Sequence, residues 1–224
     1  MKPQGIIFDA YGTLFDVHSI VHRTPGISGD LHALSVLWRQ KQVEYTWRRA
    51  LMKRYADFWQ VTSEALHSAT EKLQINPSEE EFNRLMEAYL SPDVFVDVKI
   101  ALETLKVFPL AILSNGSPTM LDAAVRVNGL DPYFAHVISV DAVKTFKPCP
   151  EVYELGTKVL GRSAEDILFV SSNAWDAAGA KAFGYRVCLC NRSGEPMDCL
   201  GFDPDFTVSR LDRILSTLDR STLE

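Results

Sequence analysis

The sequence predicts an α/β protein whose parallel sheet is interrupted by an all-helical insertion. From about residue 100 onward, short and almost wholly apolar runs alternate with helical patterns, whereas residues 17 to about 95 contain helical patterns without a strand-like run. Apolar strands that alternate with helices are typical of a parallel sheet covered on both faces. We therefore expect a Rossmann-like core made of residues 1–16 and 97–224, and a helical cap made of residues 17–96.

The composition is that of an ordinary globular protein. The 224 residues are 46% hydrophobic and 23% charged, which is enough for one large core with a smaller companion. The net charge of -6 argues against a nucleic-acid partner, because such binding depends largely on neutralising phosphates. The chain shows neither a signal peptide nor an apolar run long enough to span a membrane. We expect a cytoplasmic protein without a membrane partner.

The first predicted strand, at residues 5–8, ends in Asp9. Open parallel sheets bind their ligands at the carboxyl ends of the strands, so Asp9 is a candidate nucleophile. Gly12 allows a tight turn, and Thr13 can hydrogen-bond the carboxylate. An Asp after a strand is also commonly a helix cap or a solvated loop acid. A carboxylate that loses contact with water needs a nearby cation to stay ionised.

Three helices are predicted in the insertion, at residues 31–52, 62–73 and 79–90. Proline-containing stretches at 76–78 and 91–93 separate or end them. On the first helix, Arg39 shares a face with Val43, Trp47 and Ala50. A guanidinium in an apolar stripe either extends its charged end to water, which is the commoner behaviour, or binds an anion.

Each later predicted strand is followed by a polar cluster. The strands lie at residues 110–113, 136–139, 167–170 and 186–189, and the clusters at 114–116, 144–147, 171–173 and 191–194. Right-handed crossovers bring the carboxyl ends of such strands to one edge of the sheet. We therefore expect these clusters to meet Asp9 at that edge.

Two of these clusters carry candidate anion-binding groups. Lys147 is the candidate cation beside Asp9, although a lysine is more often on the surface, as we expect for Lys144. Ser114 follows a buried strand and precedes a helix, where a hydroxyl and free N–H groups can bind an anion. Ser117 can equally act as a simple N-cap of that helix.

The four cysteines predict reduced thiols. Cys188 and Cys190 alternate within one apolar run and would face the same side of a strand, whereas Cys149 and Cys199 lie in loop-like stretches. No CxxC spacing or Cys/His cluster is present, so we expect neither a zinc site nor a disulfide framework.

These motifs resemble the haloacid dehalogenase (HAD) superfamily and, within it, the L-2-haloacid dehalogenases, which are configuration-inverting 2-haloacid halidohydrolases. The resemblance covers nearly the whole chain, with matching motifs at residues 5–16, 37–47, 113–117, 147–148, 152–155 and 168–176. Residues 24–30 and 90–97 depart from the family pattern. The fold implied is a HAD core with an inserted helical cap.

The resemblance also indicates which chemistry is missing. Phosphatases of the superfamily carry an acid two residues after the nucleophile, to protonate the leaving group, and further acids in a later loop that ligate magnesium. This chain has Tyr11 and Ser172 at two of those positions and keeps only Asp176 in the later loop. A hard divalent cation prefers several oxygen ligands with more than one carboxylate. We therefore expect no metal and no cofactor.

The function implied is hydrolysis of carbon–halide bonds: short-chain L-2-haloalkanoic acids become D-2-hydroxyalkanoic acids through an aspartyl ester on Asp9, as in xenobiotic degradation. The catalytic residues implied are Asp9, Thr13, Lys147, Ser171, Asn173 and Asp176. The substrate-binding residues implied are Ala10, Tyr11, Arg39, Phe58, Ser114, Asn115, Tyr153 and Trp175. Arg39 and Asn115 would receive the halide, and the family further implies a homodimer.

Two alternatives remain at this stage. A divergent phosphatase acting on a small phosphate ester would have to hold magnesium with Asp9 and Asp176 as its carboxylates. A non-catalytic protein that binds small anions conflicts with the complete set of Asp, Lys, Ser and Asp on converging loops. Halide release in the presence of a chelator separates both from a dehalogenase.

Overall fold

The computed structural model describes residues 2–24, 26–196 and 200–220. Its main sheet has the strand order β5-β4-β1-β6-β7-β8, and all neighbouring strands are parallel. The strands are β1 (Gly5–Phe8), β4 (Leu110–Ser114), β5 (His136–Ser139), β6 (Ile167–Ser171), β7 (Arg186–Cys190) and β8 (Phe206–Val208). The predicted parallel α/β core is confirmed. Strand β8 was not predicted, because its residues are mostly accessible and show no apolar run.

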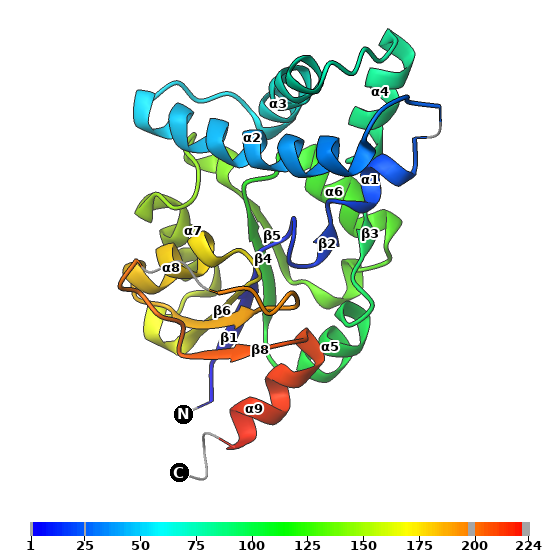
Figure 1. The fold of residues 1–224 in the computed structure, drawn as a ribbon. Coiled ribbons are helices and arrows are strands. Elements are labelled where there is room, and N and C mark those ends of the chain that lie inside the picture. The colour runs from blue at the N-terminus through cyan, green and yellow to red at the C-terminus, as the bar shows by residue number, and fades with distance from the viewer. Residues whose placement is uncertain (1, 25, 197–199, 221–224) are drawn as a thin grey trace.

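Helices cover both faces of this sheet. In Figure 1, α5 (Val98–Leu105) and α6 (Pro118–Val127) lie on one face, and α7 (Pro150–Leu160) and α8 (Ala174–Phe183) on the other. The C-terminal helix α9 (Ile214–Arg220) packs against α5. The central strands β1, β4 and β6 are buried along their whole length, as expected for strands between two helical layers.

A separate helical layer lies beyond the carboxyl ends of the strands (Figure 1). It contains α2 (Leu31–Met52), α3 (Phe58–Leu73) and α4 (Glu79–Ala88), preceded by the short α1 (Ser19–His22). Helix α3 begins earlier than predicted because the Asp57 side chain caps it, accepting from the Gln60 N–H at 2.8 Å. None of the described helices is long and apolar enough to cross a membrane.

Two short strands join the helical insertion to the core. Strand β2 (Phe15–Asp16) pairs antiparallel with β3 (Asp93–Val94). The segment that leaves the core and the segment that returns to it therefore lie side by side. The prediction that residues 17–95 contain no strand is wrong at β3, since a two-residue strand has no alternating pattern to detect. The cap boundaries at 17 and 96 stay a prediction.

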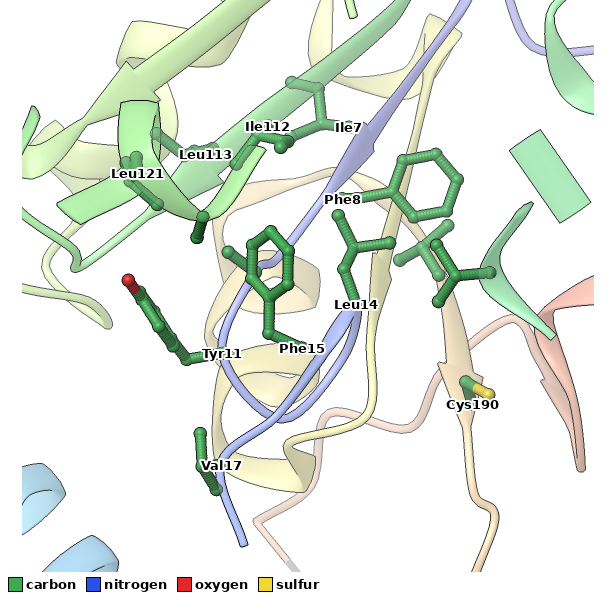
Figure 2. Close-up of a cluster of buried hydrophobic side chains, with 14 of the residues drawn as sticks. Ile7, Phe8, Tyr11, Leu14, Phe15, Val17, Ile112, Leu113, Leu121 and Cys190 are labelled. Carbon is green, nitrogen blue, oxygen red and sulfur yellow. The ribbon is translucent and has the colours of Figure 1, made fainter. Parts of the chain in front are cut away.

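Apolar side chains anchor the segment that follows β1. Figure 2 shows Tyr11, Leu14 and Phe15 continuing the cluster begun by β1 and by Ile112 of β4. Leu14 and Phe15 have no exposed surface. The loop after Asp9 is therefore held from both sides by packing, which gives the carboxylate a defined position.

The cysteines of the described residues are free thiols, as predicted. Cys188 and Cys190 are buried in β7, and burial raises the pKa of the Cys188 thiol well above its usual value. Cys149 is half-buried, and Cys199 lies outside the described residues.

Candidate active site

Asp9 follows β1 directly, and its side chain is almost completely enclosed, with 6% of the residue exposed. Its main-chain N–H donates to the carbonyl of Val170 in β6 at 2.9 Å. Carboxylate oxygen Oδ2 accepts from Thr13 Oγ1 at 2.8 Å and from Asn173 Nδ2 at 2.7 Å, and Ser171 Oγ lies 3.5 Å away. Asp9 is therefore neither a helix cap nor a solvated loop acid.

Gly12 makes the turn that brings Thr13 back to Asp9. Its φ of +92° is a conformation that side chains disfavour, and its N–H donates to the Phe15 carbonyl at 2.8 Å. A Cβ atom at this position would lie 3.3 Å from Asn173 Oδ1. Glycine is thus required both by the turn and by the close approach of Asn173.

Lys147 is the buried cation of the site. Its side chain has no exposed surface, and Nζ lies 3.0 Å from Asp9 Oδ1 and 2.9 Å from Asp176 Oδ2. Burial alone would lower the pKa of this amine, but the charges of Asp176 and Asp9 outweigh burial and raise the pKa. Lys147 therefore stays protonated and keeps a carboxylate ionised beside it. Lys144, by contrast, is exposed and pairs with Asp141.

Asp176 lies in the first turn of α8 and is fully buried. Burial raises the pKa of its carboxyl to about 6, opposed by the Lys147 charge and reinforced by the Asp9 charge. The Tyr153 hydroxyl donates to Asp176 Oδ1 at 2.8 Å. Tyr153 is fully buried, bonds to Asp176 and is not among the residues that line the cavity, so its contact with substrate stays a prediction.

A small cavity lies against Asp9, between the core and the helical layer. Its free volume is about 10 Å³, room for about one water molecule. The lining residues are Asp9, Tyr11, Arg39, Val43, Thr46, Phe58, Ser114, Asn115 and Trp175. The structure thus brings the predicted substrate-binding side chains together, apart from Tyr153 and Ala10, whose carbonyl instead accepts from the N–H of Leu14 at 2.8 Å.

Arg39 faces the Asp9 loop and does not extend to solvent. Its Nη2 donates to the Tyr11 carbonyl at 2.9 Å and approaches Asn173 Oδ1 at 3.4 Å, while Nη1 donates to Gln42 Oε1 at 2.8 Å. A half-buried guanidinium that lines a cavity beside a carboxylate is placed to bind an anion. The geometry favours that interpretation of Arg39 over an extended, solvated side chain.

Aromatic rings close the cavity. Tyr11 lies 5.9 Å from Phe58 and 5.8 Å from Tyr89, measured between ring centroids, and burial keeps the pKa of its phenol far above the usual value. Trp47 of α2 meets Trp175 of α8 edge to face at 5.6 Å, so the helical layer contacts the core directly here. These walls leave little room for water beside the Asp9 carboxylate.

Ser114, the last residue of β4, and Asn115, which follows it, lie at the same site. Ser114 is buried, and its Oγ accepts from the Gly116 N–H at 3.1 Å, which leaves its hydroxyl proton for an acceptor in the cavity. Asn115 Oδ1 accepts from the main-chain N–H of Lys147 at 3.0 Å and so joins two of the loops. Ser117 occupies the N-cap position of α6, as expected, but its side chain makes no capping hydrogen bond.

An Arg–Asp pair that sequence reasoning missed supports the loop from behind. Arg192 binds Asp97 at 3.0 Å, the Thr13 carbonyl at 3.0 Å and the Ser172 hydroxyl at 3.0 Å. Ser172 in turn donates its N–H to Thr13 Oγ1 at 2.8 Å. The only sequence signal was the polar cluster after β7. Among the described residues, no group of three or more His, Cys, Asp or Glu side chains could hold a metal ion.

Comparisons with known proteins show the family of this chain. A family model for haloacid dehalogenase-like hydrolases matches residues 3–184. Haloacetate dehalogenase H-2 of Moraxella sp. (strain B) is 47% identical, covering 96% of this chain and 97% of the relative. The (S)-2-haloacid dehalogenase of Pseudomonas sp. (strain YL) is 45% identical, covering 96% and 94%.

A solved structure of similar fold is the L-2-haloacid dehalogenase from Xanthobacter autotrophicus with chloropropionic acid covalently bound. It has a TM-score of 0.89 and 40% identity and covers 98% of this chain and 99% of its own. Each match covers nearly the full length of this chain and of the protein compared with it, so the similarity includes the helical layer as well as the core. The chain belongs to the haloacid dehalogenase-like hydrolases and, within them, to the (S)-2-haloacid dehalogenase family.

Proposed function

We propose that this protein hydrolyses short-chain L-2-haloalkanoic acids to D-2-hydroxyalkanoic acids, with inversion at C2 and a covalent ester on Asp9. The observation that carries the proposal is a nearly enclosed Asp9 carboxylate that pairs with Lys147 at 3.0 Å and lines one small cavity together with the Arg39 guanidinium. The relatives named (S)-2-haloacid dehalogenase, and the related structure with chloropropionic acid covalently bound, support it.

In the first step, an oxygen of Asp9 attacks C2 from the side opposite the halogen. The C2–O bond forms as the carbon–halogen bond breaks, and the electron pair leaves with the halide. Thr13 and Asn173 orient the carboxylate, and alignment of nucleophile and carbon can contribute roughly 7–11 kcal/mol. A halide leaves without being protonated, so the position two residues after Asp9 needs no acid and Tyr11 serves as a wall.

Different donors would hold the two anionic groups of this reaction, the substrate carboxylate and the departing halide. Ser114, together with the main-chain N–H groups of Ala10 and Tyr11, would hold the substrate carboxylate. Arg39 and Asn115 would receive the halide. Because the net charge of -6 does not attract anions, these local donors must supply the binding energy.

In the second step, water attacks the carbonyl carbon of the Asp9 ester and passes a proton to a base. The acyl C–O bond breaks, and the hydroxy acid leaves with the oxygen that had attacked C2, which takes the proton back from that base. Asp9 returns to the carboxylate when its new carboxyl group gives its proton to solvent. Ser171 and Asn173 would position this water, and the ionised Asp176 carboxylate would accept the proton. The pKa of about 6 suits Asp176 to act as a base at neutral pH.

The test is an assay of the full chain with L- and D-2-chloropropionate in the presence of EDTA. We expect chloride release from the L-enantiomer only, with D-lactate as the product and no loss of rate under chelation. Racemic or L-lactate would contradict a single displacement. Loss of activity on chelation, restored by Mg²⁺, together with release of phosphate from a small phosphate ester, would instead identify a phosphatase.

The pH profile provides a separate prediction. Asp176 must be ionised to accept a proton, so kcat should fall as the pH drops through about 6, the value to which burial raises the pKa of this carboxyl. Tyr153→Phe removes a hydrogen bond that stabilises the ionised form, so the acidic limb of the kcat profile should move to higher pH. If the acidic limb of the kcat profile does not move in the Tyr153→Phe variant, that limb reports the ionisation of a group other than Asp176.

We further propose that the protein is a cytoplasmic homodimer and that residues 17–96 form the movable cap. The free thiols of the described cysteines fit a reducing compartment. Leu51 and Met52, at the end of α2, are mainly exposed apolar side chains that a second copy could cover. Light scattering of the purified chain measures the oligomeric state, and a monomer at micromolar concentration would contradict the dimer.

A further inference from the structure

Gln42 is a fully buried polar residue in the helical layer, one helical turn after Arg39 on α2. Its Oε1 accepts from Arg39 Nη1 at 2.8 Å, and its Nε2 donates to Thr62 Oγ1 of α3 at 2.7 Å. The Tyr89 hydroxyl, just after α4, also points at Oε1, at 3.4 Å. Three segments of the helical layer therefore converge on one amide.

Thr62 determines which way this amide faces. The single hydroxyl proton of Thr62 goes to the Phe58 carbonyl at 2.6 Å, so Oγ1 can only accept from the Gln42 side. The amide NH₂ of Gln42 must therefore point to Thr62, which turns the carbonyl oxygen toward Arg39. Trp38 Nε1 donates to the Thr62 carbonyl at 2.8 Å and holds that residue in place.

The consequence for Arg39 is a guanidinium with a fixed orientation and an undiminished charge. Nη1 is bound by the Gln42 oxygen and Nη2 by the Tyr11 carbonyl and Asn173, all neutral acceptors. Within the described part of the chain, the Nε proton and the second Nη1 proton have no hydrogen-bond partner and remain for a ligand. A carboxylate in place of the Gln42 amide would pair with the guanidinium and weaken its attraction for an anion.

We propose that Gln42 is a positioning residue that aims Arg39 at the departing halide while leaving its positive charge uncompensated. The inference rests on the proposed function, because it takes Arg39 as the halide acceptor. Gln42 does not itself line the cavity, so it acts through Arg39 and not on the substrate. A residue with only a packing role would affect stability but not the dependence of the rate on the leaving group.

The test compares single-turnover ester formation from L-2-bromopropionate and L-2-chloropropionate. Chloride is the poorer leaving group and needs more stabilisation, so losing an oriented Arg39 should slow the chloro substrate more. Gln42→Met should slow ester formation from the chloro substrate about tenfold, less than the about 10²–10³ that loss of a direct donor costs. The bromo/chloro rate ratio should rise by about threefold or more, with a larger rise in Arg39→Ala.

Gln42→Glu keeps the shape of the side chain and adds a charge. This variant tests the proposal even if the Gln42→Met variant does not fold. We expect the bromo/chloro ratio to rise and inhibition by added bromide to weaken, because the acid neutralises Arg39. Thr70→Val is the matched control: Thr70 is buried in α3 and bonds only to carbonyls of its own helix. Its ratio should equal that of the wild type.

The outcomes separate the two proposals. If Arg39→Ala raises the ratio but both Gln42 variants leave it unchanged, Gln42 has a packing role only and the inference is wrong. If Arg39→Ala also leaves the ratio unchanged, Arg39 does not receive the halide and that part of the proposed function is wrong. If the wild type releases no halide from either substrate, the dehalogenase assignment itself is wrong.

Discussion

Replacing Asp9 by Asn is expected to reduce halide release by about 10⁴-fold or more while leaving the fold intact. The amide has nearly the same shape as the carboxylate, but its single oxygen can accept either from Lys147 at the Oδ1 position or from Thr13 and Asn173 at the Oδ2 position, and it lacks the charge that displaces the halide. Among the described residues, the only other carboxylate within reach of Lys147 is Asp176, which is buried on the far side of that amine. The measurement is halide release per folded enzyme, with thermal unfolding as the check on structure.

A single turnover in ¹⁸O-labelled water tests the same nucleophile without a mutation. Hydrolysis of the ester at its acyl carbon places the label in the Asp9 carboxylate and leaves the first molecules of product unlabelled. Mass spectrometry of the peptide containing Asp9 detects the label. Product labelled in its first turnover, or an Asn variant with nearly full activity, would mean that water attacks C2 directly.

Replacing Lys147 by Met should destabilise the protein and abolish turnover together. Removing one member of a buried ion pair costs about 3–5 kcal/mol, because it leaves the partner charges unpaired. Here Asp9 and Asp176 both lose the ammonium that lies about 3 Å from each. Asp176, whose pKa burial raises to about 6 even beside Lys147, then takes up a proton at neutral pH, and the base is lost.

Lys144→Met is the matched control for Lys147. Lys144 lies three residues earlier and pairs with Asp141, but most of its side chain is exposed. A pair of this kind contributes about 0–1 kcal/mol, so its loss should change neither the urea midpoint nor kcat appreciably. Equal effects of the two substitutions on unfolding, or a Lys147 variant that retains kcat at low temperature, would contradict a catalytic role for the buried amine.

Most of the nucleophile site could be predicted because it lies at strand ends. The apolar runs that become β1, β4 and β6 are visible in the sequence, and Asp9, Ser114 and Ser171 occur where those runs end. Parallel strands place such residues at one edge of the sheet whatever the intervening chain does. Lys147 lies in one of the polar clusters that follow the strands and was predicted as the cation beside Asp9, but its complete burial was visible only in the structure.

Residues that act through a partner could not be predicted in the same way. Tyr153 was expected among the substrate contacts, but its hydroxyl lies against Asp176, from which it is separated by 23 residues. Arg192 meets Asp97 across 95 residues, and Gln42 meets Thr62 across 20 residues. Helical periodicity reports which face a residue occupies, and it contains no information about the group that packs against that face.

The α/β class, the helical insertion, the nucleophile loop around Asp9 and Gly12, and the lack of phosphatase acids at Tyr11 and Ser172 could all be inferred from residue patterns. Which charges are buried together, and which way the supporting side chains point, became visible only in the folded chain. Apolar periodicity and turn residues act locally along the chain. Burial, pKa and hydrogen-bond direction, by contrast, depend on neighbours that only the packing of distant elements supplies.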